Sequence, residues 1–140
     1  QLPVALHSLV LAAPAAHPLA KIKNLRLRDM TDARFIWFPR RESAAFYDRL
    51  MYECFRGGLE SPRIVQEALN EATILTLVAQ GMGVGSVIEP ARWRCPDGVA
   101  ILKVADLKLS LPLALVWRKD NLSPLLAKFV TDVGSLVKRT

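Results

Sequence analysis

Two polar segments of this 140-residue chain carry groups that could bind an anion. The segment Pro39–Ser43 contains the neighbouring arginines Arg40 and Arg41, and a guanidinium can hold both oxygens of a carboxylate in a fork. The segment Leu69–Thr73 is the second. Each segment follows a predicted strand and leads into a predicted helix. The N–H groups in the first turn of such a helix have no intrahelical partners. The pattern indicates two loops that are suited to an anionic ligand.

The arginine pair has a second interpretation, which the sequence leaves open. Glu42 and Asp48 are close along the chain, so Arg40 and Arg41 could be surface charges that pair with these carboxylates. Loops carry binding residues more often than cores do, which keeps the ligand-binding interpretation in place.

A helix, a tight turn and a strand are predicted in sequence after the second polar segment. Asn70 is a suitable N-cap, and Glu71 lies in the first turn, where the helix dipole favours a carboxylate. Gly81 suits the left-handed position that ends a helix, and Val84–Ile88 is predicted as a short buried strand. The three glycines at the turn do not form a dinucleotide cradle, because that motif needs its strand before the glycines and its helix after them.

The nucleophiles and metal-binding side chains form no catalytic pattern. The serines lie in no nucleophile-elbow motif. His7 is expected in a strand and His17 in a turn. Cys54 and Cys95 are too few for a disulfide framework, and Cys54 is expected to be a small buried residue. We therefore predict no enzyme, no metal site and no cofactor.

The composition indicates one domain with a sizeable core. Hydrophobic residues make up 51% of the chain, but no apolar run reaches the roughly 18 residues that cross a bilayer. The apolar segment Leu6–Ala16 follows no basic region, which argues against a signal peptide. The net charge of +6 suits anionic partners, although the basic residues are too scattered to indicate nucleic-acid binding. We expect a cytoplasmic protein without membrane contact.

Alternating strand and helix patterns predict an α/β fold with βαβ units. The predicted strands are 4–12, 35–38, 63–68, 84–88, 99–104 and 111–117. The predicted helices are 43–56, 70–81 and 122–137, with a loop or short helix at 21–32 and irregular chain at 93–98.

An ordered set of short sequences resembles the effector-binding domain of LysR-type transcriptional regulators over nearly the whole chain. The set consists of Val10–Pro14, His17–Ala20, Phe35–Arg40, Phe46–Asp48, Pro62–Glu67, Leu77–Val84 and Leu111–Leu115. That domain is similar to type 2 periplasmic binding proteins, in which two α/β lobes hold a small ligand in the cleft between them.

The resemblance implies a division of the chain into two parts. Residues 1–110 would be the second, regulatory lobe with hinge strands at its ends. Residues 111–140 would be the strand and helix that return to an incomplete first lobe. The family's N-terminal helix-turn-helix has no counterpart in these residues, so we expect only the C-terminal part of the domain, with DNA bound through the absent N-terminal part.

The resemblance also implies which residues contact the effector. In the family, the loops that correspond to the two polar segments line the effector cavity. This makes Pro39, Arg40, Arg41, Asn70 and Glu71 the expected contacts of a small organic carboxylate.

The helix predicted from Ser43 to Arg56 has more apolar surface than one core needs. Two apolar rows run along it, Phe46, Leu50 and Cys54 in one and Tyr47, Met51 and Phe55 in the other. The second row could be packed under loops or could face a partner. Domains of this family pair antiparallel through a second-lobe helix, so the resemblance favours Tyr47, Met51 and Phe55 as the interface of a homodimer or homotetramer.

The predicted function is the effector sensor of a bacterial LysR-type regulator, in which ligand binding changes the geometry of a DNA-bound oligomer. The alternative is a periplasmic solute-binding protein of a transporter, which has the same architecture. We further expect the segment Leu111–Val137 to self-associate or to stay poorly packed in these residues alone, because its strand edge and its apolar helix face need partners.

Overall fold

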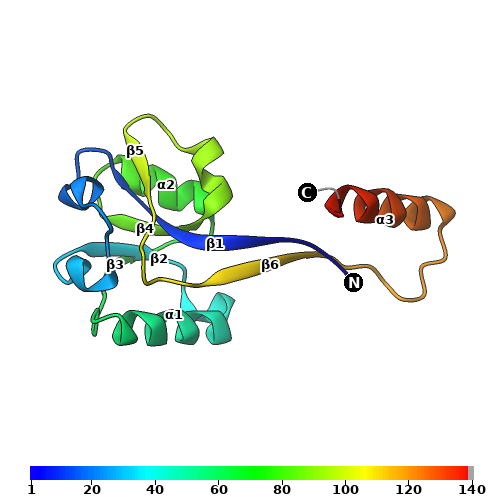
Figure 1. Ribbon diagram of the computed structural model, residues 1–140, viewed down its shortest axis with the longest axis horizontal. Helices are drawn as coiled ribbons and strands as arrows, with labels where there is room; N and C mark the ends of the chain where they lie inside the picture. The colour runs from blue at the N-terminus through cyan, green and yellow to red at the C-terminus, as the bar shows by residue number, and fades with distance from the viewer. Residues whose placement is uncertain (139–140) are drawn as a thin grey trace. The chain divides into compact units, whose positions relative to one another are not determined.

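The computed structural model describes residues 1–138, and it contains strands and helices that alternate through the middle of the chain (Figure 1). The strands are β1 (Leu2–Pro14), β2 (Arg34–Trp37), β3 (Arg63–Glu67), β4 (Val84–Ile88), β5 (Val99–Leu102) and β6 (Ser110–Leu115). The helices are α1 (Ala44–Arg56), α2 (Glu71–Ala79) and α3 (Pro124–Val137). This arrangement confirms the predicted α/β class.

The region 21–32 contains the short 3₁₀ helix Leu27–Met30, which agrees with the predicted loop or short helix. Some details differ from the sequence-based expectation. The segment Glu89–Arg94 is a 3₁₀ helix, although residues 93–98 were predicted to be irregular. Strand β5 ends at Leu102, two residues early. Strand β1 also makes a backbone hydrogen bond to the residue that precedes β6: the Leu9 N–H donates to the Leu109 carbonyl oxygen at 2.8 Å.

Residues Ser8–Leu109 form the larger of two compact units. Its strands lie in the order β3-β2-β4-β1-β5. Strand β2 is parallel to both β3 and β4, whereas β1 is antiparallel to β4 and to β5. The carboxyl ends of β2, β3 and β4 therefore lie at the same edge of the sheet, which is where open α/β sheets bind ligands.

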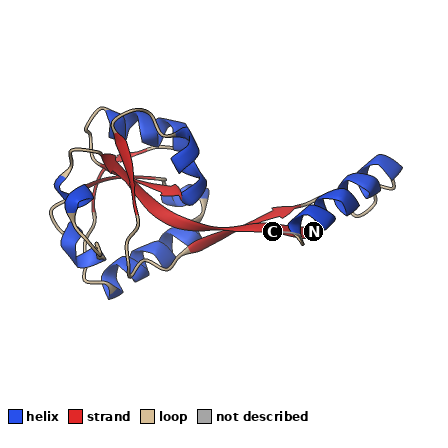
Figure 2. Cartoon of the chain, turned by 45° about the horizontal axis from the view of Figure 1, so that its top comes forward, coloured by secondary structure: helices blue, strands red, loops and turns tan. Residues whose placement is uncertain are grey.

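Helices α1 and α2 cover opposite faces of this sheet (Figures 1 and 2). Helix α2 buries Ile74, Leu75 and Val78 in a cluster with residues of β1, β2 and β4. Helix α1 buries Leu50 and Cys54. Burial raises the pKa of the Cys54 thiol to about 12, which fits its predicted role as a small core residue.

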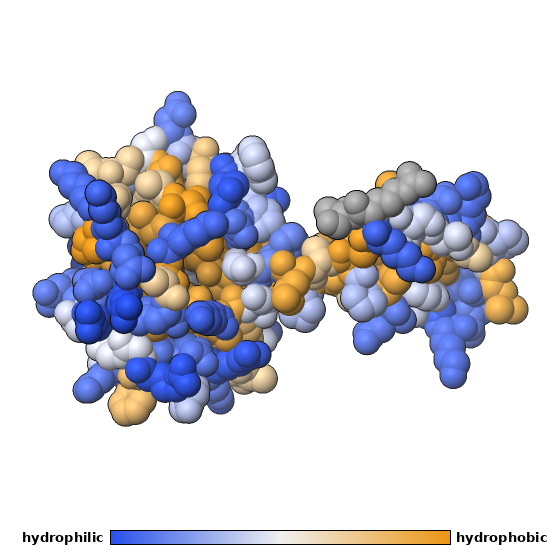
Figure 3. All heavy atoms as spheres, viewed as in Figure 1, coloured by the Kyte–Doolittle hydropathy of each residue, from blue (hydrophilic) through white to orange (hydrophobic). Residues whose placement is uncertain are grey.

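Among the described residues, the smaller unit comprises residues 1–7 together with residues 110–138. Strand β6 pairs with β1. No residue of α3 is buried, and two of its apolar side chains, Leu125 and Phe129, are 78% and 53% exposed. Apolar side chains consequently form part of the surface of this unit (Figure 3).

Candidate functional site

The parallel strands bring the two predicted loops to one edge of the sheet. Strands β2 and β3 run side by side with Trp37 opposite Glu67, and the Ala68 N–H donates to the Trp37 carbonyl oxygen at 2.9 Å. The segments Pro39–Ser43 and Leu69–Thr73 follow directly. The 3₁₀ segment Glu89–Arg94 leaves the same edge, since it follows β4.

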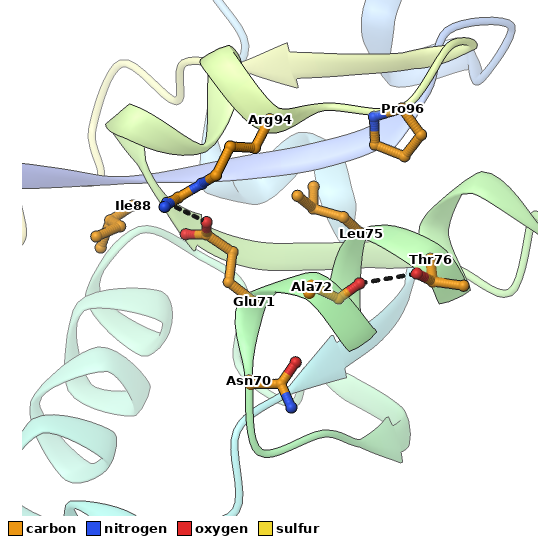
Figure 4. Close-up of a pocket in the computed structure, with 8 residues that line it drawn as sticks. All are labelled: Asn70, Glu71, Ala72, Leu75, Thr76, Ile88, Arg94 and Pro96. Carbon is orange, nitrogen blue, oxygen red and sulfur yellow. Dashed lines mark hydrogen bonds and ion pairs between the residues drawn. The ribbon is translucent and has the colours of Figure 1, made fainter.

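A pocket of about 680 Å³ opens at the start of α2 (Figure 4). It is lined by Asn70, Glu71, Ala72, Leu75, Thr76, Ile88, Arg94 and Pro96. The walls are mainly apolar, and the two charged side chains lie at the helix end. The pocket thus contains two of the five residues expected to contact an effector, Asn70 and Glu71.

The first turn of α2 supplies the polar end of the pocket. The Asn70 side-chain oxygen Oδ1 accepts hydrogen bonds from the Thr73 N–H at 2.9 Å and from Thr73 Oγ1 at 3.0 Å, which confirms the predicted N-cap. The N–H groups of Glu71 and Ala72 come before the first intrahelical bond, so no helix carbonyl can accept from them. This end of the helix therefore favours negative charge.

The second charged residue of the pocket, Arg94, was not among the predicted contacts. Its Nη2 lies 2.5 Å from Glu71 Oε1, across 23 positions of sequence (Figure 4). The Arg94 side chain is 64% exposed and that of Glu71 is 23% exposed. One signal in the sequence could have identified Arg94, because it follows the predicted strand 84–88, which ends at the same edge of the sheet. The chain at 93–98 was predicted to be irregular, so the sequence did not indicate where the Arg94 side chain points.

The predicted residues of the loop after β2 are buried or lie beside carboxylates of the chain. The Pro39 side chain is buried. Arg40 donates from Nε and Nη2 to the two carboxylate oxygens of Asp48, both at 2.7 Å, and this bond lowers the pKa of the Asp48 carboxyl. Arg41 lies 3.9 Å from a carboxylate oxygen of Glu42. The structure therefore contains the pairing that the sequence offered as the alternative, and none of these residues lines the pocket.

The outer surface of α1 carries partly exposed aromatic side chains. Tyr47 and Met51 are half-buried, and Tyr47 packs edge-on against Phe38 with ring centroids 5.7 Å apart. Phe55 is 61% exposed and Tyr52 is 59% exposed. The exposed surface of the helix thus includes Tyr52, which the sequence-based row of three residues did not contain.

A second pocket, of about 410 Å³, lies beside His17 and Arg34. The His17 Nδ1 accepts a hydrogen bond from the Leu19 N–H at 3.2 Å, so this histidine caps a turn as expected. Burial and the nearby Arg34 charge lower its pKa. Within residues 1–138, no group of three His, Cys, Asp or Glu side chains could hold a metal ion.

The described part of the chain has no helix with the length and apolar character needed to cross a bilayer.

Comparison with known sequences identifies the domain family of the chain. Residues 1–135 match the family of the LysR substrate binding domain. The HTH-type transcriptional regulator YwbI of Bacillus subtilis (strain 168) is 32% identical over 115 residues, which cover 81% of this chain and 37% of YwbI. The chain spans about 40% of the length of the curated relatives that it matches.

Solved structures share the fold. The effector binding domain of QuiR in complex with shikimate aligns with a TM-score of 0.74 at 21% identity, over 99% of this chain and 65% of that one. The BenM effector binding domain with its effector benzoate aligns with a TM-score of 0.73 at 20% identity, over 99% of this chain and 64% of that one. The mixed α/β sheet is therefore that of effector-binding domains in this class of regulators.

Proposed function

This chain belongs to the LysR substrate binding domain family, a family of transcriptional regulators and not of enzymes. We propose that it senses a small organic carboxylate, which binds in the pocket at the start of α2. Binding would shift the equilibrium between arrangements of a homodimer or homotetramer, and so act on DNA held by an N-terminal helix-turn-helix outside these residues.

The observation that carries this proposal is the pocket itself. An α-helix begins there with free N–H groups, Arg94 supplies a guanidinium, and Leu75, Ile88 and Pro96 supply an apolar wall. Shikimate and benzoate, the ligands of QuiR and BenM, each combine one carboxylate with a six-membered carbon ring. A ligand of that type matches the charge at one end of the pocket and the apolar walls beyond it.

We retain the five predicted contacts as part of the proposal, with different roles. Asn70 and Glu71 line the pocket. Arg41 is the freer of the two neighbouring arginines, because its contact with Glu42 is long, whereas Arg40 is held by two bonds to Asp48. Pro39 fixes the start of their loop.

The lobes and the oligomer are also proposals. Residues 1–110 would form the second lobe with its hinge strands, and residues 111–140 would belong to the first lobe. The QuiR domain is longer than this chain, which covers 65% of it, and this supports an incomplete first lobe. Tyr47, Met51 and Phe55, together with the exposed Tyr52, would lie in the subunit interface on α1.

A periplasmic solute-binding protein is the alternative with the same architecture. The match to DNA-binding regulators such as YwbI supports the sensor instead, and with it a cytoplasmic location.

The test is a titration of the chain with benzoate and with shikimate. Calorimetry and amide chemical shifts are the readouts. We expect the shifts to centre on the start of α2 and on Arg94. Arg94→Gln should weaken binding about 10- to 100-fold, the effect of losing a hydrogen bond to a charged group. Arg92→Gln is the matched control, because Arg92 lies in the same 3₁₀ segment but pairs with Glu89 and does not line the pocket. Equal binding by wild type and Arg94→Gln would contradict the assigned site.

A further inference from the structure

The pocket at the start of α2 already contains a carboxylate that belongs to the chain. Glu71 and Arg94 are the two charged residues among those that line it, and they form an ion pair with each other (Figure 4). The formal charge of the lining is therefore zero. An anionic ligand that enters meets a guanidinium whose charge is already neutralised.

Glu71 occupies the attractions that such a ligand would use. It lies in the first turn of α2, where the positive end of the helix dipole favours a negative charge, and its Oε1 contacts Arg94 Nη2. A ligand carboxylate bound at the helix end and on Arg94 would compete with Glu71 for both. Because Glu71 belongs to the chain, it stays near the helix end even when a ligand takes its contacts.

The geometry of the Glu71–Arg94 pair would also allow a ligand carboxylate to replace Glu71 on the guanidinium. Arg94 is held by one contact, whereas Arg40 is held by Asp48 through two bonds at 2.7 Å. A guanidinium has five N–H donors in a fork, so a ligand carboxylate can form the bidentate arrangement that Glu71 does not. Because the Arg94 side chain is 64% exposed, solvent screens the pair, and its loss costs little.

We propose that Glu71 is a built-in competitor for Arg94, which an effector must displace, and that it selects monocarboxylates over dicarboxylates. This inference rests on the proposed function of the pocket. Once displaced, Glu71 remains beside the bound ligand, so one guanidinium and one helix end must stabilise two negative charges. A second carboxylate on the ligand would bring a third negative charge into the same pocket, and like charges close together in a partly desolvated site repel.

The experiment compares benzoate with isophthalate, which adds one carboxylate to the same ring. The 140-residue chain and its Glu71→Gln, Glu89→Gln and Arg94→Gln variants are titrated at pH 7.5, with calorimetry and amide chemical shifts as readouts. Glu89→Gln is the matched control, because it makes the same change in net charge within the same unit and Glu89 pairs with Arg92 and Lys103, outside the pocket lining.

We expect Glu71→Gln to bind benzoate about 5- to 10-fold more tightly than wild type and to gain more for isophthalate. Glu89→Gln should change either affinity by less than about 2-fold, since its charge is screened by solvent. Arg94→Gln should weaken the binding of both ligands by about 10- to 100-fold. A gain of affinity on removal of a charged side chain is not what general structural damage produces, and circular dichroism checks that each variant is folded.

The outcomes separate this inference from the proposed function. If wild type binds benzoate in the pocket and Glu71→Gln binds it no better, the competitor role is overturned while the effector pocket stands. If Glu71→Gln binds but wild type does not, the competitor role is supported. If the shifts map to another region, or if neither protein binds either acid, both the competitor role and the pocket assignment are overturned.

Discussion

Helices α2 and α3 both carry apolar side chains at helical spacing, but their surroundings differ. In α2, Ile74, Leu75 and Val78 are buried against the sheet of the larger unit. In α3, no residue of Pro124–Val137 is buried. Apolar residues at helical spacing therefore predict a helix and its apolar face, but they do not specify which part of the molecule covers that face.

Hydrogen exchange should give the largest contrast between the two helices. We expect the amides near Val78 to be protected at least about 1,000-fold and those near Val130 less than about 10-fold, because no residue of α3 is fully buried and a helix of this length with little packing is marginal in water. Mass spectrometry or NMR of the chain measures both. Equal protection would mean that α3 is packed, and protection that rises with protein concentration, together with light scattering, would show that a second copy covers it.

Two phenylalanines give the next contrast. Phe35 is 2% exposed and stacks on Trp37, whereas Phe129 is 53% exposed. Phe35→Ala should lower the free energy of unfolding by about 3–5 kcal/mol, and Phe129→Ala by less than about 0.5 kcal/mol. Urea unfolding followed by circular dichroism compares them. Similar losses for the two variants would contradict the difference in packing.

Alanine substitutions at two glycines should change stability in opposite directions. A Cβ at Gly85 would overlap Ile74 Cγ2 and lie 3.0 Å from Val78 Cγ2, so Gly85→Ala should destabilise the larger unit by about 1–3 kcal/mol. A Cβ at Gly134 would meet Leu2 Cδ2 at 3.7 Å, an ordinary contact. Gly134→Ala should therefore stabilise α3 by about 0.5–1 kcal/mol through helix propensity. Helical content and the urea midpoint are the measurements, and a loss of helix in Gly134→Ala would show that position 134 is more tightly packed than this contact indicates.

The helix caps give the smallest contrast. Asn70 accepts two hydrogen bonds at the start of α2, while the Ser123 side chain makes no capping bond at the start of α3. Asn70→Ala should cost about 1 kcal/mol and Ser123→Ala close to nothing. If thermal unfolding shows equal effects, the cap of α2 does not contribute as its geometry suggests.

Local signals in the sequence predicted much of the larger unit. The cap at Asn70, the left-handed Gly81 with φ of 76° and the strand Val84–Ile88 are all confirmed. Each depends on residues a few positions apart, whose backbone preferences do not require the rest of the fold. The α/β class followed from the alternation of such elements.

The side-chain pairs at the candidate site depend on contacts that no local pattern specifies. The sequence suggested an anion site with Asn70 and Glu71, and left open whether Arg40 would bind a ligand or pair with Asp48. The tertiary structure placed Arg40 on Asp48 and brought Arg94 to Glu71 from 23 positions away. The physical reason is that a long charged side chain takes its partner from whatever the strand order brings within a few ångströms, and the order β3-β2-β4-β1-β5 is set by packing of the whole sheet.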